Sequence, residues 1–468
     1  MTLGRHQNQR QGILPFMVEM AQRDDVTARA GLTLVVEAMR ALQLDEVAQD
    51  ELPVPSRQSE FSPADKLESL VMLIAAGGDR LEDIRILSED KGLERLLGKP
   101  FPSPDTLIDF LSQFHDEKCW DNRPPEKKAF VPPESKPLLG LETINRELVA
   151  RGANRATTTA TIDHDGTIIE SHKREALVAY EGTRGYQPLV AVWAEEQLIV
   201  ADEFRDANVA GGEDPLSSVK RAFRNLPPWV NEKFFRGDSA SYYAPLLKYL
   251  AGENIGFAIS ADMTPQLRAL CLAVPPGEWT LIEKRAREMV DIAEVEFTPG
   301  DWPKTAHPLR YIAIRFTPTQ VELFGGVDAP RGPKYIAIVS NRKTLKASDL
   351  VLWHRGKAGT IEHVHRVMKD ELGAGVMPSG RFGINAAWFR INALAFNVLT
   401  VLKRRALPER YLLARPKRLR FEIFTAPGKL ASHQSHLSVK ISTAPQRAEE
   451  FIAARGKLLA MLETAQLS

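Results

Sequence analysis

Two aspartates, Asp163 and Asp165, lie near the end of the stretch TTTATIDHDGTIIE at residues 157–170. Its β-branched residues predict a strand, because branched Cβ atoms fit a pleated surface better than a helical turn. The segment HDG supplies turn chemistry, and TIIE resumes the β-branched pattern. We therefore expect two adjacent strands with the two carboxylates at or near their junction, where they can meet a metal ion.

Two further acids follow at places where a strand or a helix would present them. Asp238 comes directly after NEKFFRG, whose apolar pair predicts a short strand, so this acid also lies at a strand end. Glu362 lies in GKAGTIEHVHRVMKDELGAG, which predicts a helix that ends at Gly373. A three-strand meander and one helix would fill the separation between Asp163 and Asp238. The order of the acids predicts that they meet in one cleft.

Acids in this order are suited to phosphodiester chemistry. Hydrolysis or transfer of a phosphodiester requires charge stabilisation at the attacking and the leaving oxygen, which two Mg²⁺ ions about 4 Å apart can provide. Hard cations of this kind take carboxylate oxygens as ligands. We expect Asp163, Asp238 and Glu362 to be catalytic and to bind two Mg²⁺ ions, or Mn²⁺ in their place. Asp165 is either a supporting acid or an alternative ligand, and the sequence leaves both roles open.

Basic residues gather around and beyond Glu362. Residues 341–430 hold 18 Lys and Arg against 6 Asp and Glu, whereas residues 1–130 hold 16 against 23. A basic segment of this kind is typical of a phosphate-binding surface, with a solvated face as the alternative. The residues expected to contact DNA phosphates are Arg355, Lys357, Arg366 and Lys369. Three histidines lie among them, and we interpret these as surface or DNA-facing residues, because His363 and His365 point to different faces of a helix.

The elements predicted around the acids occur in the order βββ, α, β, α, β. After the first strand, YQPLVAVWAEEQLIVADEF predicts two strands, DPLSSVKRAFRNLP a helix, the Asp238 segment a strand, APLLKYLAGE a helix and IGFAIS a strand. Three antiparallel strands followed by alternating helix and strand are typical of an RNase H-like arrangement, whereas a Rossmann sheet alternates from its start. Residues 262–350 then break the alternation with EWTLIEKR, DIAEVEFT, LRYIAIRF, QVELFGG and KYIAIVS. These runs predict a β-rich insertion of its own.

A chain of 468 residues is too long for one typical core, which predicts two or three domains. The N-terminal region reads as helical, with Ser62 and Ser103 as expected N-caps of two helices. RINALAFNVL belongs to a long buried helix, and AEEFIAARGKLLAMLETA to an amphipathic one. The expected α/β chain comprises a helical N-terminal domain for DNA-end binding or dimerisation (1–130), a linker (131–150), the first part of an RNase H-like core (151–261), the β-rich insertion (262–350), the second part of the core with the acidic helix (351–405) and a basic, helical C-terminal region (406–468).

Composition excludes several other classes of protein. The start, MTLGRHQNQRQG, has no apolar signal region, and no charge-free run of about 20 apolar residues follows, which favours a cytoplasmic protein with no membrane partner. The two cysteines, Cys119 and Cys271, are far apart and form no CxxC pair, which argues against a zinc site and a disulfide framework. A bound metal ion would therefore be held by oxygen atoms.

The segments DHDGT, GYQPL, RGDS and GKAGTIEHVHRVMKDELG together resemble the DDE transposases of bacterial insertion sequences, and they are most similar to the 1380 insertion-sequence family. The resemblance covers most of the chain, including GKPFPSPDTLIDFL and RINALAFNVL. In related families the acidic helix carries Tyr, two residues, Arg, three residues, Glu, six residues and Lys. Glu362 and Lys369 match this pattern, whereas Arg355 and Ala358 stand at the Tyr and Arg positions.

The resemblance implies a protein that moves DNA by cut-and-paste transposition. It implies an RNase H-like core interrupted by a β-rich insertion, and double-stranded DNA as the partner, both at terminal inverted repeats and at the target. Asp163, Asp238 and Glu362 would hold two Mg²⁺ ions for hydrolysis and then for strand transfer. We further expect a homodimer that holds two DNA ends together, in a nucleoid-associated bacterial protein.

Two other functions compete with this reading. DHDGT also fits the nucleophile motif of haloacid dehalogenase-like phosphatases, in which the first Asp takes the phosphoryl group and the second is the acid or base. The late metal motif of those enzymes needs another acid soon after GDS, and SASYYAPLL supplies none. A catalytically retired DNA-binding descendant would keep the basic segment and lose an acid, whereas Asp163, Asp238 and Glu362 are all present.

Overall fold

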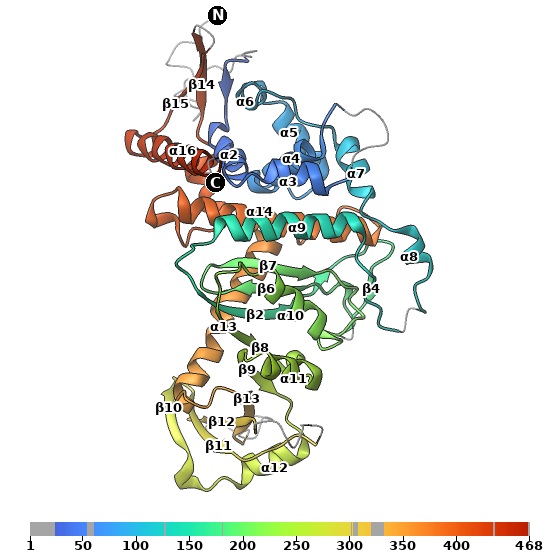
Figure 1. The fold of residues 1–468 in the computed structure, drawn as a ribbon, viewed down its shortest axis with the longest axis vertical. Helices are drawn as coiled ribbons and strands as arrows, with labels where there is room; N and C mark the ends of the chain where they lie inside the picture. Colours follow the sequence, from blue (N-terminus) through green and yellow to red (C-terminus); the bar gives the residue numbers. More distant parts are fainter. Residues whose placement is uncertain are drawn as a thin grey trace, which may run out of the picture.

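The computed structural model describes residues 24–53, 60–125, 128–179, 181–300, 302, 308–319, 332–433 and 436–466. It is a mixed α/β structure built around one large sheet. The N-terminal helices and the C-terminal elements lie at one end of the long axis, and the strands of residues 280–340 lie at the other end (Figure 1). Within these described ranges, no helix is long and apolar enough to cross a membrane.

A nine-stranded mixed sheet runs along the middle of the molecule. Its strands in spatial order are β10 (Thr280–Lys284), β11 (Glu288–Val295), β12 (Arg310–Pro318), β13 (Lys334–Ser340), β9 (Gly256–Ala261), β8 (Glu232–Gly237), β2 (Thr159–Gly166), β6 (Leu189–Trp193) and β7 (Leu198–Glu203). β2 is parallel to β8 and antiparallel to β6, while β9 is parallel to β8. Helices α10 (Pro215–Arg224) and α11 (Ala244–Gly252) precede β8 and β9, which confirms the predicted order of elements after the meander.

The strands of the predicted insertion extend this central sheet. β13 pairs antiparallel with β9, and β12, β11 and β10 follow outward. Residues 262–350 are therefore β-rich, as predicted, but their strands do not form a separate unit, because β13 satisfies the N–H and C=O groups that β9 would otherwise leave unpaired at an edge. Four predicted runs correspond to β10–β13, and QVELFGG lies outside the described residues.

A separate three-stranded sheet lies between β2 and β6 in the chain. It has the order β3 (Ile169–Glu170), β5 (Arg184–Tyr186) and β4 (Leu177–Val178). The expectation that TIIE forms a strand beside β2 is wrong, because β6 and β8 occupy both edges of β2 and β3 pairs with β5 instead.

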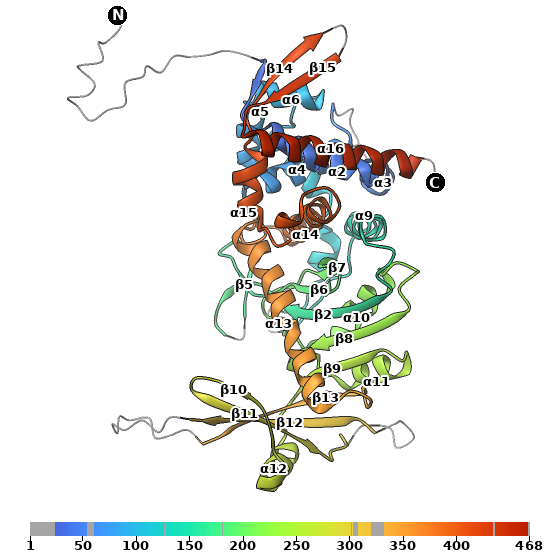
Figure 2. The ribbon, with the colours of Figure 1, turned by 90° about the vertical axis from the view of Figure 1, so that its left-hand side faces the viewer.

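Helices cover both faces of the sheet around β2. α13 (Ala347–Asp370) crosses one face, and α10 packs on the other (Figure 2). Side chains alternate along β2 accordingly: Asp163 accepts a hydrogen bond from Thr360 of α13, whereas His164 reaches Ser218 of α10. The end of β2 therefore lies beneath the helix that carries Glu362.

Two long helices, α9 (Lys136–Gly152) and α14 (Phe382–Arg405), lie along the β7 edge of the sheet (Figure 1). α14 is buried on all sides from Phe382 to Lys403, which confirms the predicted buried helix. α9 occupies most of residues 131–150, so the expected linker is wrong for this part of the chain. Pro137 lies in the first turn of α9, where a missing N–H is tolerated.

The N-terminal region is helical, as predicted. Its α-helices are α2 (Thr33–Ala41), α3 (Leu44–Glu51), α4 (Pro63–Ala76), α5 (Ile84–Ser88), α6 (Lys91–Leu97), α7 (Pro104–Ser112) and α8 (Glu117–Asp121). Ser62 caps α4 by accepting a hydrogen bond from the Asp65 amide at 3.1 Å, and Ser103 caps α7. Gly77 ends α4 with φ of 99°, a conformation that glycine adopts without strain.

The C-terminal region contains a β-hairpin that the sequence analysis did not predict. β14 (Gly428–His433) and β15 (His436–Ile441) form the hairpin, and β14 also pairs with β1 (Val26–Thr27). The predicted amphipathic helix is confirmed as α16 (Pro445–Gln466), which packs on α2. Between α14 and the hairpin, α15 (Pro416–Leu419) leads into a π-helical turn at Arg420–Phe424.

Candidate active site

The acids predicted from β2 and β8 lie where the ends of these two strands meet α13. The strands are adjacent and parallel, with Asp163 opposite Arg236 in the register, and Asp238 directly follows β8. Because side chains alternate along a strand, Asp163 and Asp165 both face α13. We call Asp163, Asp165, Arg236, Asp238 and Lys357 the strand-end site.

Asp163 is fully buried, and other side chains engage both of its carboxylate oxygens. Arg236 donates from Nε to Oδ1 at 2.6 Å and from Nη2 to Oδ2 at 2.8 Å, and the Thr360 hydroxyl also donates to Oδ2. Arg236 in turn donates from Nη1 to the Trp353 carbonyl at 2.7 Å. Asp163 therefore joins β2, β8 and α13 through one buried ion pair.

Asp165 lies two residues further along β2 and is less buried, with its side chain 24% exposed. Its Oδ2 accepts a hydrogen bond from Lys357 Nζ of α13 at 2.9 Å. Burial and then the negative charge of Asp165 raise the pKa of Asp238, while Lys357 opposes this shift. Asp165 and Asp238 are therefore close enough to interact electrostatically, and Lys357 faces both.

Two of the histidines on α13, the buried His365 and the half-buried His354, face the strand-end site, so their interpretation as surface or DNA-facing residues is wrong. His354 Nε2 lies 3.0 Å from the Gly237 carbonyl oxygen, and burial lowers the pKa of His354 to about 4. Burial also lowers the pKa of His365 to about 4, while Asp165 opposes the shift. Both imidazoles are therefore neutral at pH 7.

Glu362 is exposed on α13, between two lysines that reach the β2 end of the sheet. Lys357 contacts Asp165, and Lys369 Nζ lies 3.5 Å from the Ile168 carbonyl oxygen. With 3.6 residues per turn, Glu362 points within about 20° of Lys369 around the helix axis. Within the described part of the chain, no three His, Cys, Asp or Glu side chains form a group that could hold a metal ion, so Glu362 is not assembled with Asp163 and Asp238 here.

The four basic residues expected to contact DNA differ in how far they are already engaged. Lys357 is largely buried against Asp165, and Arg355 Nη1 lies 2.8 Å from Glu283 Oε2 on β10. Lys369 Nζ lies near the Ile168 carbonyl oxygen, just after the end of β2. Arg366 is exposed, with Nη2 3.4 Å from His363 Nδ1. Of the four, Arg366 is the residue whose charge faces solvent most openly.

Sequence reasoning missed Arg236 and Thr360, which hold Asp163. An arginine in an apolar strand is a usable signal, because a buried guanidinium requires an acid close by. Gly356 of α13 gives Arg236 its space, since a Cβ at that position would lie 2.5 Å from Arg236 Nη1. The glycine in RGKAG therefore permits a close approach between α13 and β8.

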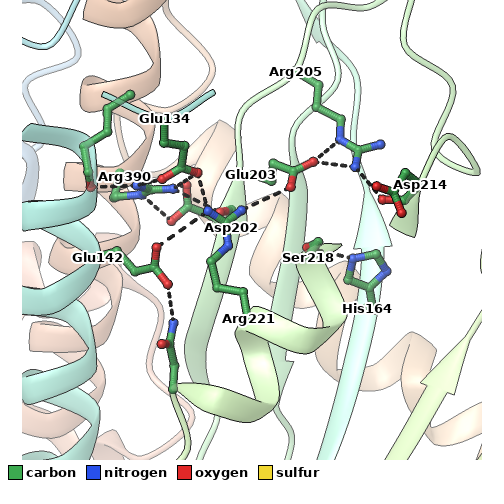
Figure 3. Close-up of polar contacts among 12 residues, drawn as sticks. Glu134, Glu142, His164, Asp202, Glu203, Arg205, Asp214, Ser218, Arg221 and Arg390 are labelled. Carbon is green, nitrogen blue, oxygen red and sulfur yellow. Dashed lines mark hydrogen bonds and ion pairs between the residues drawn. The ribbon is translucent and has the colours of Figure 1, made fainter. Parts of the chain in front are cut away.

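A second charged cluster lies at the β7 edge of the sheet (Figure 3). We call it the β7 charge cluster, and its members are Glu134, Glu142, Asp202, Glu203, Arg205, Arg221 and Arg390. Arg390 of α14 donates to Asp202 at 2.9 Å and to Glu134 at 2.8 Å. Arg221 of α10 contacts Glu134, and also lies 3.2 Å from Glu203 of β7. The cluster therefore joins α9, α10 and α14 to the sheet.

One known family matches nearly the whole chain. The sequence model described as transposase DDE domain, group 1, matches residues 18–462. Among solved structures, a cryo-EM structure of a piggyBac transposase synaptic complex with hairpin DNA is similar, at 10% sequence identity and a TM-score of 0.44. That similarity covers 93% of this chain and 82% of the other chain. No curated protein matches the chain.

Proposed function

The chain belongs to the DDE transposase family, group 1, and we propose that it binds the terminal inverted repeats of a bacterial insertion sequence and moves that element by cut-and-paste transposition. We further propose that the element is similar to the 1380 insertion-sequence family, and that two copies of the chain hold its two DNA ends. The observation that carries the proposal is a pair of carboxylates, Asp165 and Asp238, at the ends of adjacent parallel strands beneath the helix of Glu362.

We propose that β2, β6, β7, β8 and β9, with α10, α11 and α13, make up an RNase H-like core. The support is the order of the elements, with an antiparallel meander followed by two parallel strands, each preceded by a helix. In this reading β10–β13 are an insertion between the last core strand and the acidic helix. The N-terminal helices and the basic C-terminal region would then be the parts that recognise DNA ends or form the dimer.

We propose Asp165, Asp238 and Glu362 as the residues that hold divalent cations, either Mg²⁺ or Mn²⁺. Asp165 and Asp238 offer the carboxylate oxygens that such ions require, and together they carry more negative charge than Lys357 balances. We assign Asp163 a positioning role, since Arg236 and Thr360 already engage both of its oxygens. When bound, the ions supply charge stabilisation at the attacking and leaving oxygens of a phosphodiester.

The other residues of the site keep it in shape before and during the reaction. The ion pair of Arg236 with Asp163 holds the ends of β2 and β8 together, and its bond to the Trp353 carbonyl holds the first half of α13 over them. Lys357 gives Asp165 a positive partner at the place where two carboxylates come close. Neutral His354, bonded to the Gly237 carbonyl, fixes the backbone directly before Asp238.

The phosphatase alternative receives no support from this geometry. In that mechanism the first aspartate of DHDGT, Asp163, would attack phosphorus and would need a free carboxylate oxygen facing a substrate cavity. Asp163 is instead 0% exposed and held by Arg236 and Thr360.

An end-cleavage assay with Mg²⁺ on labelled duplexes carrying the terminal repeats of the element tests the proposal. We expect Asp238→Asn and Glu362→Gln to bind these duplexes as the wild type does. Each variant should cleave the duplexes more than about 100-fold more slowly than the wild type. Changes to residues that only hydrogen-bond to a metal ligand already lower activity by up to about 100-fold, and loss of a ligand itself should lower it more. Asp370→Asn is the matched control, because Asp370 is an exposed acid on the same helix.

The control variant should cleave at the wild-type rate. Full cleavage by Asp238→Asn or Glu362→Gln would refute the role given to that residue. Absence of repeat-specific binding and of cleavage by the wild-type chain would refute the proposed function itself.

A further inference from the structure

Two large apolar side chains project from the segment that follows α14. Leu413 is 82% exposed and Phe421 is 80% exposed, more than any other large apolar side chain among the described residues. Both line an open groove of about 720 Å³. Exposed apolar side chains gathered around a groove are typical of an interaction site, because covering them removes apolar surface from water.

Basic side chains surround these two apolar ones. The groove is also lined by Arg415, Lys417, Arg418 and Arg420. Acids balance two of them: Arg415 Nε lies 2.9 Å from Glu371 Oε1, and Arg418 Nε lies 2.8 Å from Glu422 Oε1. The groove therefore keeps an excess of positive charge, and a polyanion is the complementary partner.

Glu371 joins the groove to the helix that carries Glu362. It directly follows α13, and its Oε2 accepts a hydrogen bond from the Lys417 amide at 3.0 Å, in addition to the ion pair with Arg415. The nine residues from Glu362 to Glu371 span about 14 Å along a helix. That distance is the rise of about four base pairs of duplex DNA.

The surface between Glu362 and the groove is basic as well. Arg366 of α13 is exposed about one helical turn after Glu362, and the Arg415 side chain at the groove is 47% exposed. A DNA strand that reaches Glu362 would find basic side chains as far as the groove.

We propose that this groove binds DNA a few base pairs from the cleavage position, with phosphates on Arg415, Lys417 and Arg418 and with unstacked bases against Leu413 and Phe421. The inference rests on the proposed transposase function. Phosphate binding alone would leave the two apolar side chains unexplained. Leucine and phenylalanine wedges pack against opened base steps, and aromatic rings stack on single bases regardless of sequence.

Binding of the full-length chain to two fluorescent duplexes tests the proposal. One duplex is a fully paired end of the element, and the other carries a mismatch bubble beside the cleavage position. We expect the wild type to bind the bubble duplex about 10-fold more tightly, the scale of one stacked base. Leu413→Ala/Phe421→Ala should lose this preference and keep its affinity for the paired duplex. Ile452→Ala is the matched control, since Ile452 is 67% exposed on α16, outside the groove.

Lys417→Ala provides a separate test of the phosphate contacts. It should weaken binding of both duplexes alike and reduce the magnitude of the slope of log K against log salt by about 1.

Equal preference for the bubble in the wild type and in Leu413→Ala/Phe421→Ala would overturn the proposal, and so would a change in oligomeric mass of that variant without a change in DNA binding. Loss of the preference in Ile452→Ala would overturn it too. A wild type that binds neither duplex would refute the transposase function as well, whereas intact cleavage by groove variants with unchanged preference would refute the groove alone.

Discussion

The strand-end site and the β7 charge cluster lie on the same sheet and differ in how their charges are balanced. In the β7 charge cluster, Arg390 is paired with Asp202 and Glu134, and Arg221 with Glu134 and Glu203. In the strand-end site, Asp163 is paired with Arg236, but Asp165 and Asp238 together face one ammonium group, that of Lys357.

The difference separates residues that hold the fold from residues that are available for chemistry. Removal of either partner of a buried ion pair leaves the other charge uncompensated, so both residues are needed to keep the arrangement of the elements that carry them. Two close carboxylates with one cation between them retain negative charge that a divalent ion can balance. By this criterion Asp163 resembles the paired acids of the β7 charge cluster, although it lies only two residues from Asp165 in the sequence.

The largest expected effect on stability is that of Arg390→Met. This change removes a fully buried guanidinium and leaves Asp202 and Glu134 facing each other without it. We expect the free energy of unfolding to fall by about 3–5 kcal/mol, measured by urea denaturation. Arg80→Met is the control, since its ion pair with Asp79 is exposed, and it should cost less than about 1 kcal/mol. Equal stability of the two variants would show that the β7 charge cluster does not hold the fold.

Asp163→Asn and Asp165→Asn sharpen the comparison within one strand. Asp163→Asn leaves Arg236 buried without its counter-charge, so we expect a loss of about 3 kcal/mol in unfolding free energy. Asp165→Asn should change it by less than about 1 kcal/mol, because Asp165 is partly exposed and Lys357 keeps Asp238 as a neighbour. Urea denaturation of both variants measures this difference. The reverse order of stabilities would contradict the division between a positioning acid and a free acid.

The pH dependence of stability tests the β7 charge cluster in a different way. Burial opposes ionisation of Glu134, but Arg390 and Arg221 lower its pKa from 4.5 to about 2. A lowered pKa in the folded state contributes stability that is present above about pH 4.5 and is lost as the pH falls towards about 2. We expect Glu134→Gln to be less stable than the wild type by about 2–3 kcal/mol at pH 7, with the gap closing between pH 4.5 and pH 2. A gap that is independent of pH would contradict the ion-pair explanation.

Local signals in the sequence were sufficient for many elements. Ser62 and Ser103 begin helices as predicted, because a side-chain cap needs only residues within one turn. The order of strands and helices around β2 also follows from periodicity that each segment carries by itself. The hairpin of β14 and β15 was missed because its sequence, GKLASHQSHLSVKI, is polar and poor in β-branched residues.

The choice between Asp163 and Asp165 could not be made from the sequence. Both residues lie on the same face of β2, so alternation gives them equal standing. What distinguishes them is the register with β8, which sets Arg236 opposite Asp163, and the position of Lys357 on a helix nearly 200 residues away. Such pairings depend on residues far apart in the chain. The same limit applies to β13, whose pairing with β9 makes the insertion part of the central sheet.

Exchange of single carboxylates for thiolates tests most directly which acid binds the cation. Mg²⁺ requires oxygen ligands, whereas Mn²⁺ lies in the transition-metal series and tolerates a softer ligand. Asp165→Cys and Asp163→Cys should both fail to cleave terminal-repeat DNA in Mg²⁺. We predict that Mn²⁺ restores cleavage by Asp165→Cys and not by Asp163→Cys. Restoration in Asp163→Cys, with none in Asp165→Cys, would contradict the assignment of Asp165 to the metal and Asp163 to the ion pair with Arg236.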